Sequence, residues 1–311
     1  MICVSKLLSK KRVSSFELVR VEETKRMLSH VLSACRSGSD REVNMSEVFF
    51  TLANDILCRA AYGRRFLKKE GQNRHLTAVP MEAQALFGGF CAGDFYPVWE
   101  YLVDRVNGFR RRLERSLEDM TNICDEIIKE HVDRSTDSRE EDFVDVLFRA
   151  QRREDLEVPI TDDNVKALVM DMFVVETDTT SAVLEWTLTE LVRHPENDEE
   201  STRRRMDPES WEDPLKYDPE RFKDHNIEFK DQDFRFLPFG GGRRGCPGYA
   251  FGLATIELGL ALLLYYFDWA LPQGDGADDV NLDEIFGLAT RKKTPLIVVP
   301  TANKDYEFKA F

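Results

Sequence analysis

Cys246 lies in a glycine-rich segment, residues 236–248, that reads FLPFGGGRRGCPG. Glycine lets a backbone take positive φ and approach a bulky ligand, and Pro247 has the fixed φ that suits a first helical position. The dipole of a following helix stabilises a thiolate by only about 0.3–1 kcal/mol, which does not ionise an ordinary thiol at neutral pH. A coordinated metal does deprotonate a thiol. The segment therefore indicates a metal ligand at Cys246, with Arg243 and Arg244 offering forked donors to carboxylates beside it.

Two other interpretations of this segment stay open at this point. Gly240, Gly242 and Gly245 spell GxGxxG, and Asp268 follows 23 residues after the last of them, which would suit a dinucleotide-binding turn. Against that interpretation, Pro238 is unfavourable in a central strand and no βαβ pattern surrounds the loop. The remaining interpretation is a buried structural cysteine in a glycine turn.

A second polar cluster, residues 176–180, reads ETDTT and lies inside an apolar helical period that runs from 162 to 194. Thr161 is the expected N-cap, and at 1.5 Å per residue the helix would be roughly 50 Å long. We expect Thr179 to bond back to the carbonyl four residues earlier and bend the helix, which makes room for a small ligand. Asp178 is a candidate proton relay. The other interpretation is that these polar residues face water.

The cysteine segment is similar to the FxxGxRxCxG haem loop of the cytochrome P-450 superfamily, the haem-thiolate monooxygenases. It matches at Phe239, Gly242, Arg244, Cys246 and Gly248. The resemblance implies haem b, with Cys246 as the proximal thiolate on iron, Arg244 as a propionate partner and Phe239 packed over the sulfur. A thiolate ligand favours O–O cleavage, so the resemblance also implies O2 as co-substrate and electrons from NADPH through a reductase.

The polar cluster resembles the oxygen-activation motif of the same family, (A/G)GxDTT, which implies catalytic roles for Asp178 and Thr179 above the haem. The chain departs from that motif at two positions. The family has glycine where this chain has Glu176, and a small residue where it has Val175. An unpaired buried carboxylate at Glu176 would cost several kcal/mol, so we expect it to be protonated, paired or turned toward solvent.

The box Pro219–Phe222 matches the PERF motif, whose arginine pairs in the family with a glutamate and an arginine from an upstream ExxR helix. Here Glu200 and Arg203 have that spacing, as do Glu190 and Arg193, but neither pair carries the surrounding family sequence. The interval between Arg203 and the box is too short for the strands that the family places there. We therefore expect an internal deletion near residue 200 that removed the ExxR helix.

The expected fold is mainly α with a small β portion, an incomplete cytochrome P-450 fold. We expect one domain over 1–311, with a helical part, 1–196, that includes the long oxygen-activation helix. The other part, 207–311, would hold the haem loop and the C-terminal elements. The membrane anchor and first sheet strands of the family are expected to be absent, so that the chain is truncated at its N-terminus. The LPFGGGRRGCPG loop and the WEDPLKYDPERF box look most like plant enzymes of specialised metabolism.

Several elements can be placed from periodicity. Helices are expected over 12–37 and 46–62, with Gly63 as the stop of the second. Residues 87–97 are rich in glycine and aromatic residues and should interrupt the helical pattern before a long amphipathic helix that includes Trp99. The sequence also predicts a helix from Pro247 to Phe267, a buried core helix rather than a membrane span, and a strand at Pro295–Val299.

Composition limits the class of partner and compartment. The 311 residues carry a formal charge of −14, which argues against a nucleic-acid surface, and 42% of them are hydrophobic, enough for a sizeable core. The six cysteines show no CxxC pair or zinc spacing and fit a reducing compartment. Resemblance implies the cytosolic face of the endoplasmic reticulum membrane, whereas without the anchor the chain could be soluble.

Three functions remain open from the sequence. The first is a haem-thiolate monooxygenase that inserts one oxygen atom of O2 into an apolar small molecule. The second is a catalytically inactive relative that binds haem only or does not fold. The third is a nicotinamide-dinucleotide-binding oxidoreductase, which depends on the GxGxxG coincidence.

Overall fold

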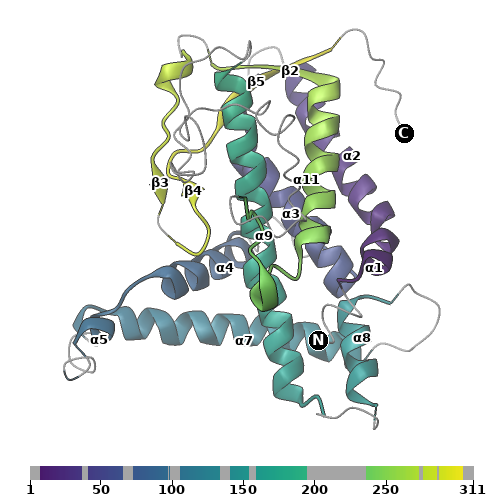
Figure 1. Cartoon of the computed structure of the whole chain (residues 1–311), viewed down its shortest axis with the longest axis vertical. Coiled ribbons are helices and arrows are strands. Elements are labelled where there is room, and N and C mark those ends of the chain that lie inside the picture. Colours follow the sequence, from purple (N-terminus) through teal and green to yellow (C-terminus); the bar gives the residue numbers. More distant parts are fainter. Residues whose placement is uncertain are drawn as a thin grey trace.

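The computed structural model describes residues 8–36, 41–65, 73–96, 98, 106–133, 141–153, 159–194, 236–272, 276–285 and 287–303. The fold is mainly α with a small β portion, as predicted (Figure 1). The helices of the N-terminal part are α1 (Lys10–Ser15), α2 (Glu17–Arg36), α3 (Met45–Tyr62), α4 (Asn73–Gly88), α5 (Ala92–Phe95), α7 (Phe109–Asp133), α8 (Phe143–Gln151) and α9 (Asp162–Arg193). Later elements are the 3-10 turns η2 (Gly242–Arg244) and η3 (Ala277–Asp279), and helix α11 (Tyr249–Tyr266).

Helix α9 is the long central helix that the sequence predicts. Thr161 is its N-cap: the Thr161 hydroxyl accepts from the Asn164 N–H at 3.2 Å, and the Asn164 side chain accepts from the Thr161 N–H at 3.1 Å. The helix has 32 residues, so its length is about 48 Å. Figure 1 shows α9 running the height of the molecule beside α11 and α3. Along its length it packs against α3, α4, α7, α8 and α11.

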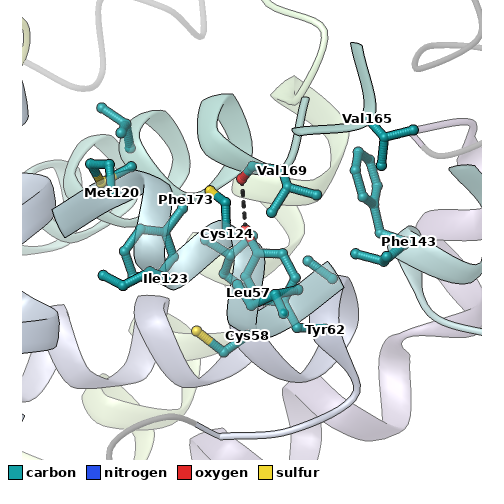
Figure 2. Close-up of a cluster of buried hydrophobic side chains, with 14 of the residues drawn as sticks. Leu57, Cys58, Tyr62, Met120, Ile123, Cys124, Phe143, Val165, Val169 and Phe173 are labelled. Atoms are coloured by element: carbon teal, nitrogen blue, oxygen red, sulfur yellow. Dashed lines mark hydrogen bonds between the residues drawn. The ribbon is translucent and has the colours of Figure 1, made fainter. Parts of the chain in front are cut away.

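One hydrophobic cluster joins the C-terminal half of α3 to α7, α8 and the first half of α9 (Figure 2). Tyr62 lies in it with its ring centroid 6.3 Å from that of Phe173. The Tyr62 hydroxyl donates to the Val169 carbonyl at 3.0 Å, which satisfies its polar atom inside the apolar cluster. We call this the lower cluster.

A second hydrophobic cluster lies between α2, the N-terminal half of α3, the second half of α9 and α11. Its fully buried members include Phe49, Leu184, Leu188 and Leu263, and Val298 joins it from a strand. We call this the upper cluster. Helices α3 and α9 contribute to both clusters, so these two helices form the common frame of the fold.

The small β portion is antiparallel. Strand β5 (Ile297–Ala302) pairs with β1 (Val43–Asn44) on one side and β2 (Phe267–Ala270) on the other. Strand β3 (Glu284–Ile285) pairs with β4 (Arg291–Lys292) in a separate hairpin. The predicted strand over 295–299 is therefore displaced by two or three residues toward the C-terminus.

Several predicted boundaries need correction. The helix expected over 12–37 is divided at Phe16 into α1 and α2, while α3 and its stop at Gly63, with φ 67°, are confirmed. Helix α4 extends through Gly88, so the interruption begins later than predicted. Helix α7 begins at Phe109, and Trp99 lies outside the described residues.

Helix α11 was expected to be a buried core helix, and this is right for one stripe of its surface. Phe251, Thr255, Gly259 and Leu263 are buried at intervals of four residues. By length and composition α11 could also cross a membrane, and 22% of that window is buried in the protein. The buried stripe packs toward the upper cluster.

Candidate active site

The loop that carries Cys246 is shaped by two glycines and three backbone hydrogen bonds. Gly240 and Gly242 have φ of 69° and 66°, in the region that favours glycine. The Cys246 N–H donates to the Phe239 carbonyl at 2.7 Å, the Gly240 N–H to the Leu237 carbonyl at 3.1 Å, and the Gly245 N–H to the Gly242 carbonyl at 3.3 Å. These bonds fold the loop back on itself and leave Cys246 exposed.

The residues of this loop fit haem in the chemistry and the space that they offer. The Cys246 thiol is accessible to a metal, and a Cβ placed on Gly242 or Gly248 would meet nothing within 4 Å, so a flat group can come close. Arg243 and Arg244 are exposed, and neither forms an ion pair with another described residue. Their forked donors are therefore open to carboxylates of a bound group.

The start of α11 differs slightly from the prediction. Gly248 is the N-cap and Tyr249 the first helical residue, two positions after Pro247. The Gly248 carbonyl accepts from the N–H groups of Phe251 and Gly252, each at 3.0 Å. Phe239 is half-buried, with its ring centroid 6.0 Å from that of Tyr249. Whether Phe239 also covers the Cys246 sulfur stays a prediction.

The predicted bond inside the polar cluster of α9 is present. The Thr179 hydroxyl donates to the Val175 carbonyl at 3.1 Å. Thr179 is exposed whereas Thr180 is buried, so the two hydroxyls face different surroundings. The Cβ position of Gly252 in α11 lies 3.6 Å from the Thr180 hydroxyl. The polar cluster thus contacts the helix that follows the Cys246 loop; the side chain of Glu176 lies outside the described side chains.

Asp178 is buried and lies beside an arginine that the sequence did not single out. Its side chain is 2% exposed, and the Arg291 Nε lies 3.3 Å from its Oδ2. Among the described residues, neither carboxylate oxygen of Asp178 has a hydrogen-bond partner, and the Arg291 Nε has none either, so the contact between them is one of charge. Burial raises the pKa of Asp178, and the charge of Arg291 opposes that rise. The sequence offered no signal for this pair, because Arg291 stands in a basic run beside a strand.

A cavity of about 340 Å³ opens at the same place. Its walls come from α3, α4, α9 and the β3–β4 hairpin, and its lining includes Phe50, Met81, Asp178, Glu185, Arg291 and Pro295. This volume lies in the range of small-molecule sites. Cys246 does not line this cavity. Asp178 therefore faces a small-molecule-sized space that is separate from the thiol.

The pair at ExxR spacing near the end of α9 is also buried. The Arg193 Nη1 lies 3.5 Å from the Glu190 Oε2, and the Arg193 Nε donates to the Ala277 carbonyl at 3.2 Å. This pair joins α9 to η3. The other ExxR pair, Glu200 with Arg203, and the Pro219–Phe222 box lie outside the described residues.

A known family model matches the chain over the segments that carry the α9 polar cluster and the Cys246 loop. The cytochrome P-450 family model matches residues 1–203 and 201–299. The chain belongs to the cytochrome P-450 family. It is similar to plant members of that family, as the resemblance predicted. Members of this family carry haem iron, use O2 and receive electrons that originate from NADPH.

This cytochrome P-450 is similar to three plant enzymes over nearly its whole length. The chain is 44% identical over 384 residues to a tryptamine 5-hydroxylase of Oryza sativa subsp. japonica, covering 99% of this chain and 73% of the relative. It is 33% identical to a germacrene A hydroxylase of Barnadesia spinosa, over 97% of this chain and 73% of the relative. It is 31% identical to a desmethyl-deoxy-podophyllotoxin synthase of Sinopodophyllum hexandrum, over 98% of this chain and 73% of the relative. Monooxygenase chemistry is therefore the activity of its family.

The comparison also supports the predicted internal deletion. The match to the rice relative spans 384 positions although this chain has 311 residues, so at least 73 positions, the difference, have no counterpart here. The family model splits at residues 201–203, inside the interval where the sequence predicts the missing ExxR helix.

The dinucleotide interpretation is not supported. Residues 236–241 form a turn where a Rossmann-type site needs a strand. All strand pairs in the described part of the chain are antiparallel, whereas that site needs a parallel sheet.

Proposed function

We propose that this chain binds haem b through the Cys246 thiolate and inserts one oxygen atom of O2 into an apolar small molecule, with electrons from NADPH through a reductase. The observation that carries the proposal is the exposed Cys246 thiol in a loop bent by Gly240 and Gly242, within a cytochrome P-450 chain. The bound group supplies the oxygen activation that a thiolate ligand favours. The protein's own residues then have to hold that group and manage protons.

Each predicted site residue has a distinct task in this proposal. Cys246 ligates the iron, Arg244 pairs with a carboxylate of the bound group, and Gly242 and Gly248 leave it room. Phe239, packed on Tyr249, shields the ligand side from water.

On α9, Thr179 and Asp178 hold and move a proton. The bond from Thr179 to the Val175 carbonyl locally perturbs the helix. Asp178, which has no hydrogen-bonded partner among the described residues, can accept a proton at either carboxylate oxygen.

The decisive experiment is the reduced carbon-monoxide difference spectrum of the purified chain, expressed with haem supply. We expect a red-shifted, thiolate-type Soret band that is lost in Cys246→Ser. Cys91→Ser is the matched control, because Cys91 is half-buried and lies far from the loop in sequence. No haem uptake, or a neutral-ligand band in the parent chain, would favour the inactive-relative alternative.

Turnover is tested separately from haem binding. Tryptamine is the first substrate to try because the 44%-identical rice relative is named for its hydroxylation. With a plant reductase, NADPH and ¹⁸O2, one labelled oxygen atom should appear in the product. A thiolate-type spectrum without product from tryptamine or a terpene panel would leave haem binding as the retained property.

We also propose that the chain works at the cytosolic face of the endoplasmic reticulum membrane. Large apolar side chains between residues 87 and 106 are exposed, namely Phe87, Phe90, Phe95, Tyr96, Val98 and Val106. Figure 1 shows α5, within this segment, at the outer tip of the arm formed by α4 and α7. Flotation of the chain with liposomes checks this, and recovery in the soluble fraction would contradict it.

A further inference from the structure

Arg291 meets Asp178 because the β3–β4 hairpin folds against α9. The two groups lie far apart in the sequence, yet the Arg291 Nε is 3.3 Å from the Asp178 Oδ2. The Arg291 side chain is 23% exposed and the Asp178 side chain 2%, so solvent screens this contact weakly. Such a charge acts strongly on a buried carboxylate.

The hairpin is fastened to α9 by contacts that do not involve Asp178. The Trp186 indole N–H donates to the Thr290 carbonyl at 3.0 Å. The Lys292 Nζ lies 5.1 Å from the centre of the Trp186 ring and donates to the Asn281 carbonyl at 2.6 Å. Thr290 and Lys292 are the two neighbours of Arg291 in the chain. Trp186 therefore holds the backbone of Thr290 and contacts the side chain of Lys292, the residues on either side of Arg291.

Three of the other charged groups at the cavity, Glu185, Lys292 and Lys293, have partners of their own. Glu185 accepts from the Ser46 hydroxyl, whose oxygen also accepts from the Leu296 N–H. Lys293 lies 3.6 Å from the Asp283 carboxylate, and Lys292 is bound to Asn281. Glu47, from the first turn of α3, completes the charged lining. Arg291 is thus the charge that acts on Asp178 within the described structure.

We propose that Arg291 is the positioning residue for Asp178: its charge keeps the carboxylate ionised and turned toward the cavity, ready to accept a proton from that side. An unpaired carboxylate in this buried place would take up a proton and remain neutral. The relay role of Asp178 belongs to the proposed function, and this inference rests on it. The inference adds that Arg291 keeps Asp178 ionised before a proton is transferred to it.

The test reads the ionisation of Asp178 directly. Infrared difference spectra of the purified full chain, labelled with ¹³C-aspartate, follow carboxyl protonation as pH is changed, and Asp178→Asn identifies the band. In Arg291→Gln the midpoint should rise by about 1–3 pH units, the usual effect of losing a close opposite charge. Arg291→Lys, which keeps the charge, should stay near the parent value.

Trp186→Phe is the structural control. It removes the hydrogen bond to Thr290 but keeps the charge of Arg291, so the Asp178 midpoint should move far less than in Arg291→Gln. The proposal is overturned if Arg291→Gln leaves the midpoint in place. It is equally overturned if Arg291→Lys or Trp186→Phe moves the midpoint as far as Arg291→Gln does.

The result is separable from the proposed function. The carboxyl titration needs no turnover, and the carbon-monoxide spectrum of the same samples reports haem binding independently. A shifted titration in a chain without the thiolate-type band would support the role of Arg291 while the proposed function fails. An unshifted titration in a chain with the thiolate-type band would support haem binding and contradict the role of Arg291.

Discussion

The Cys246 loop and the middle of α9 hold the two halves of the candidate site, and different interactions fix their structures. In α9, Phe173 and Asp178 are both buried, and packing from several helices fixes them. In the loop, Gly242, Arg244 and Cys246 are exposed, and backbone hydrogen bonds fix the shape instead.

This difference matches what each region is proposed to do. A relay residue such as Asp178 needs a defined environment, which burial supplies. A ligand loop needs accessible side chains, which burial would remove. Perturbing the two regions in parallel should therefore give contrasting results.

The largest contrast should appear in thiol reactivity. Cys124 is buried, and burial raises its pKa from 9.0 to about 11, which lowers its thiolate fraction about a hundredfold near pH 8. Cys246 is exposed. Iodoacetamide should modify Cys246 at least a hundredfold faster in haem-free protein, and haem should protect it, as read by peptide mass spectrometry. Equal labelling rates would show that the loop is covered.

Removing an aromatic ring from each region comes next. Phe173→Ala should lower the free energy of unfolding by about 3–5 kcal/mol, because it leaves a cavity in the lower cluster. Phe239→Ala, at a half-buried loop position, should cost about 1 kcal/mol. Urea denaturation of the two variants measures both. Similar losses would mean that the loop contributes to the core as much as α9 does.

Burial in the helical core also changes the pKa of a carboxyl group in α3. Burial, together with the nearby Glu23, raises the pKa of Asp55 from 3.8 to about 6. Because the folded-state pKa lies above the unfolded one, the stabilisation is complete below about pH 4 and is lost as pH rises through about 6. This loss is about 3 kcal/mol. Asp55→Asn should abolish it, whereas Glu22→Gln, which changes an exposed carboxylate paired with Arg59, should follow the parent. Chemical denaturation at stepped pH checks the difference between parent and variant.

The smallest effect is expected within the loop itself. Gly242→Ala places a Cβ at φ 66° and should cost about 1–2 kcal/mol. Gly248 has φ −89° and open space around it, so Gly248→Ala should change the free energy of unfolding by less than about 0.5 kcal/mol. If both alanines cost the same in thermal unfolding, the backbone shape is not what orders the loop.

Features set by a few neighbouring residues could be predicted from the sequence. Thr161 as an N-cap, Gly63 as a stop and the bond from Thr179 to the Val175 carbonyl were all correct. Each depends on contacts within four residues. The family was likewise predictable, because the Cys246 loop has fixed residue types at fixed spacing.

Features that join distant segments could not be predicted. Arg291 reaches Asp178 because the β3–β4 hairpin folds against α9. The residue pattern of neither segment predicts this contact. The break of the first helix at Phe16 was missed for a related reason. Periodicity continues through Phe16, whose ring packs edge-on against Phe251 of α11 with the centroids 6.3 Å apart, a contact that the sequence pattern does not show. The roles of the predicted site residues stay predictions.

The arrangement of the two clusters bears on how such a chain could arise in evolution. The buried residues that build both clusters come from residues 13–192 and from residues 251–298. The break in the family match, at residues 201–203, falls between these two sets. A genomic deletion at that place removes chain from between the core-forming segments and leaves both sets of core residues encoded. Natural selection would then act on a protein that keeps both sets of core residues and lacks the segment between them, in which we expect the ExxR helix.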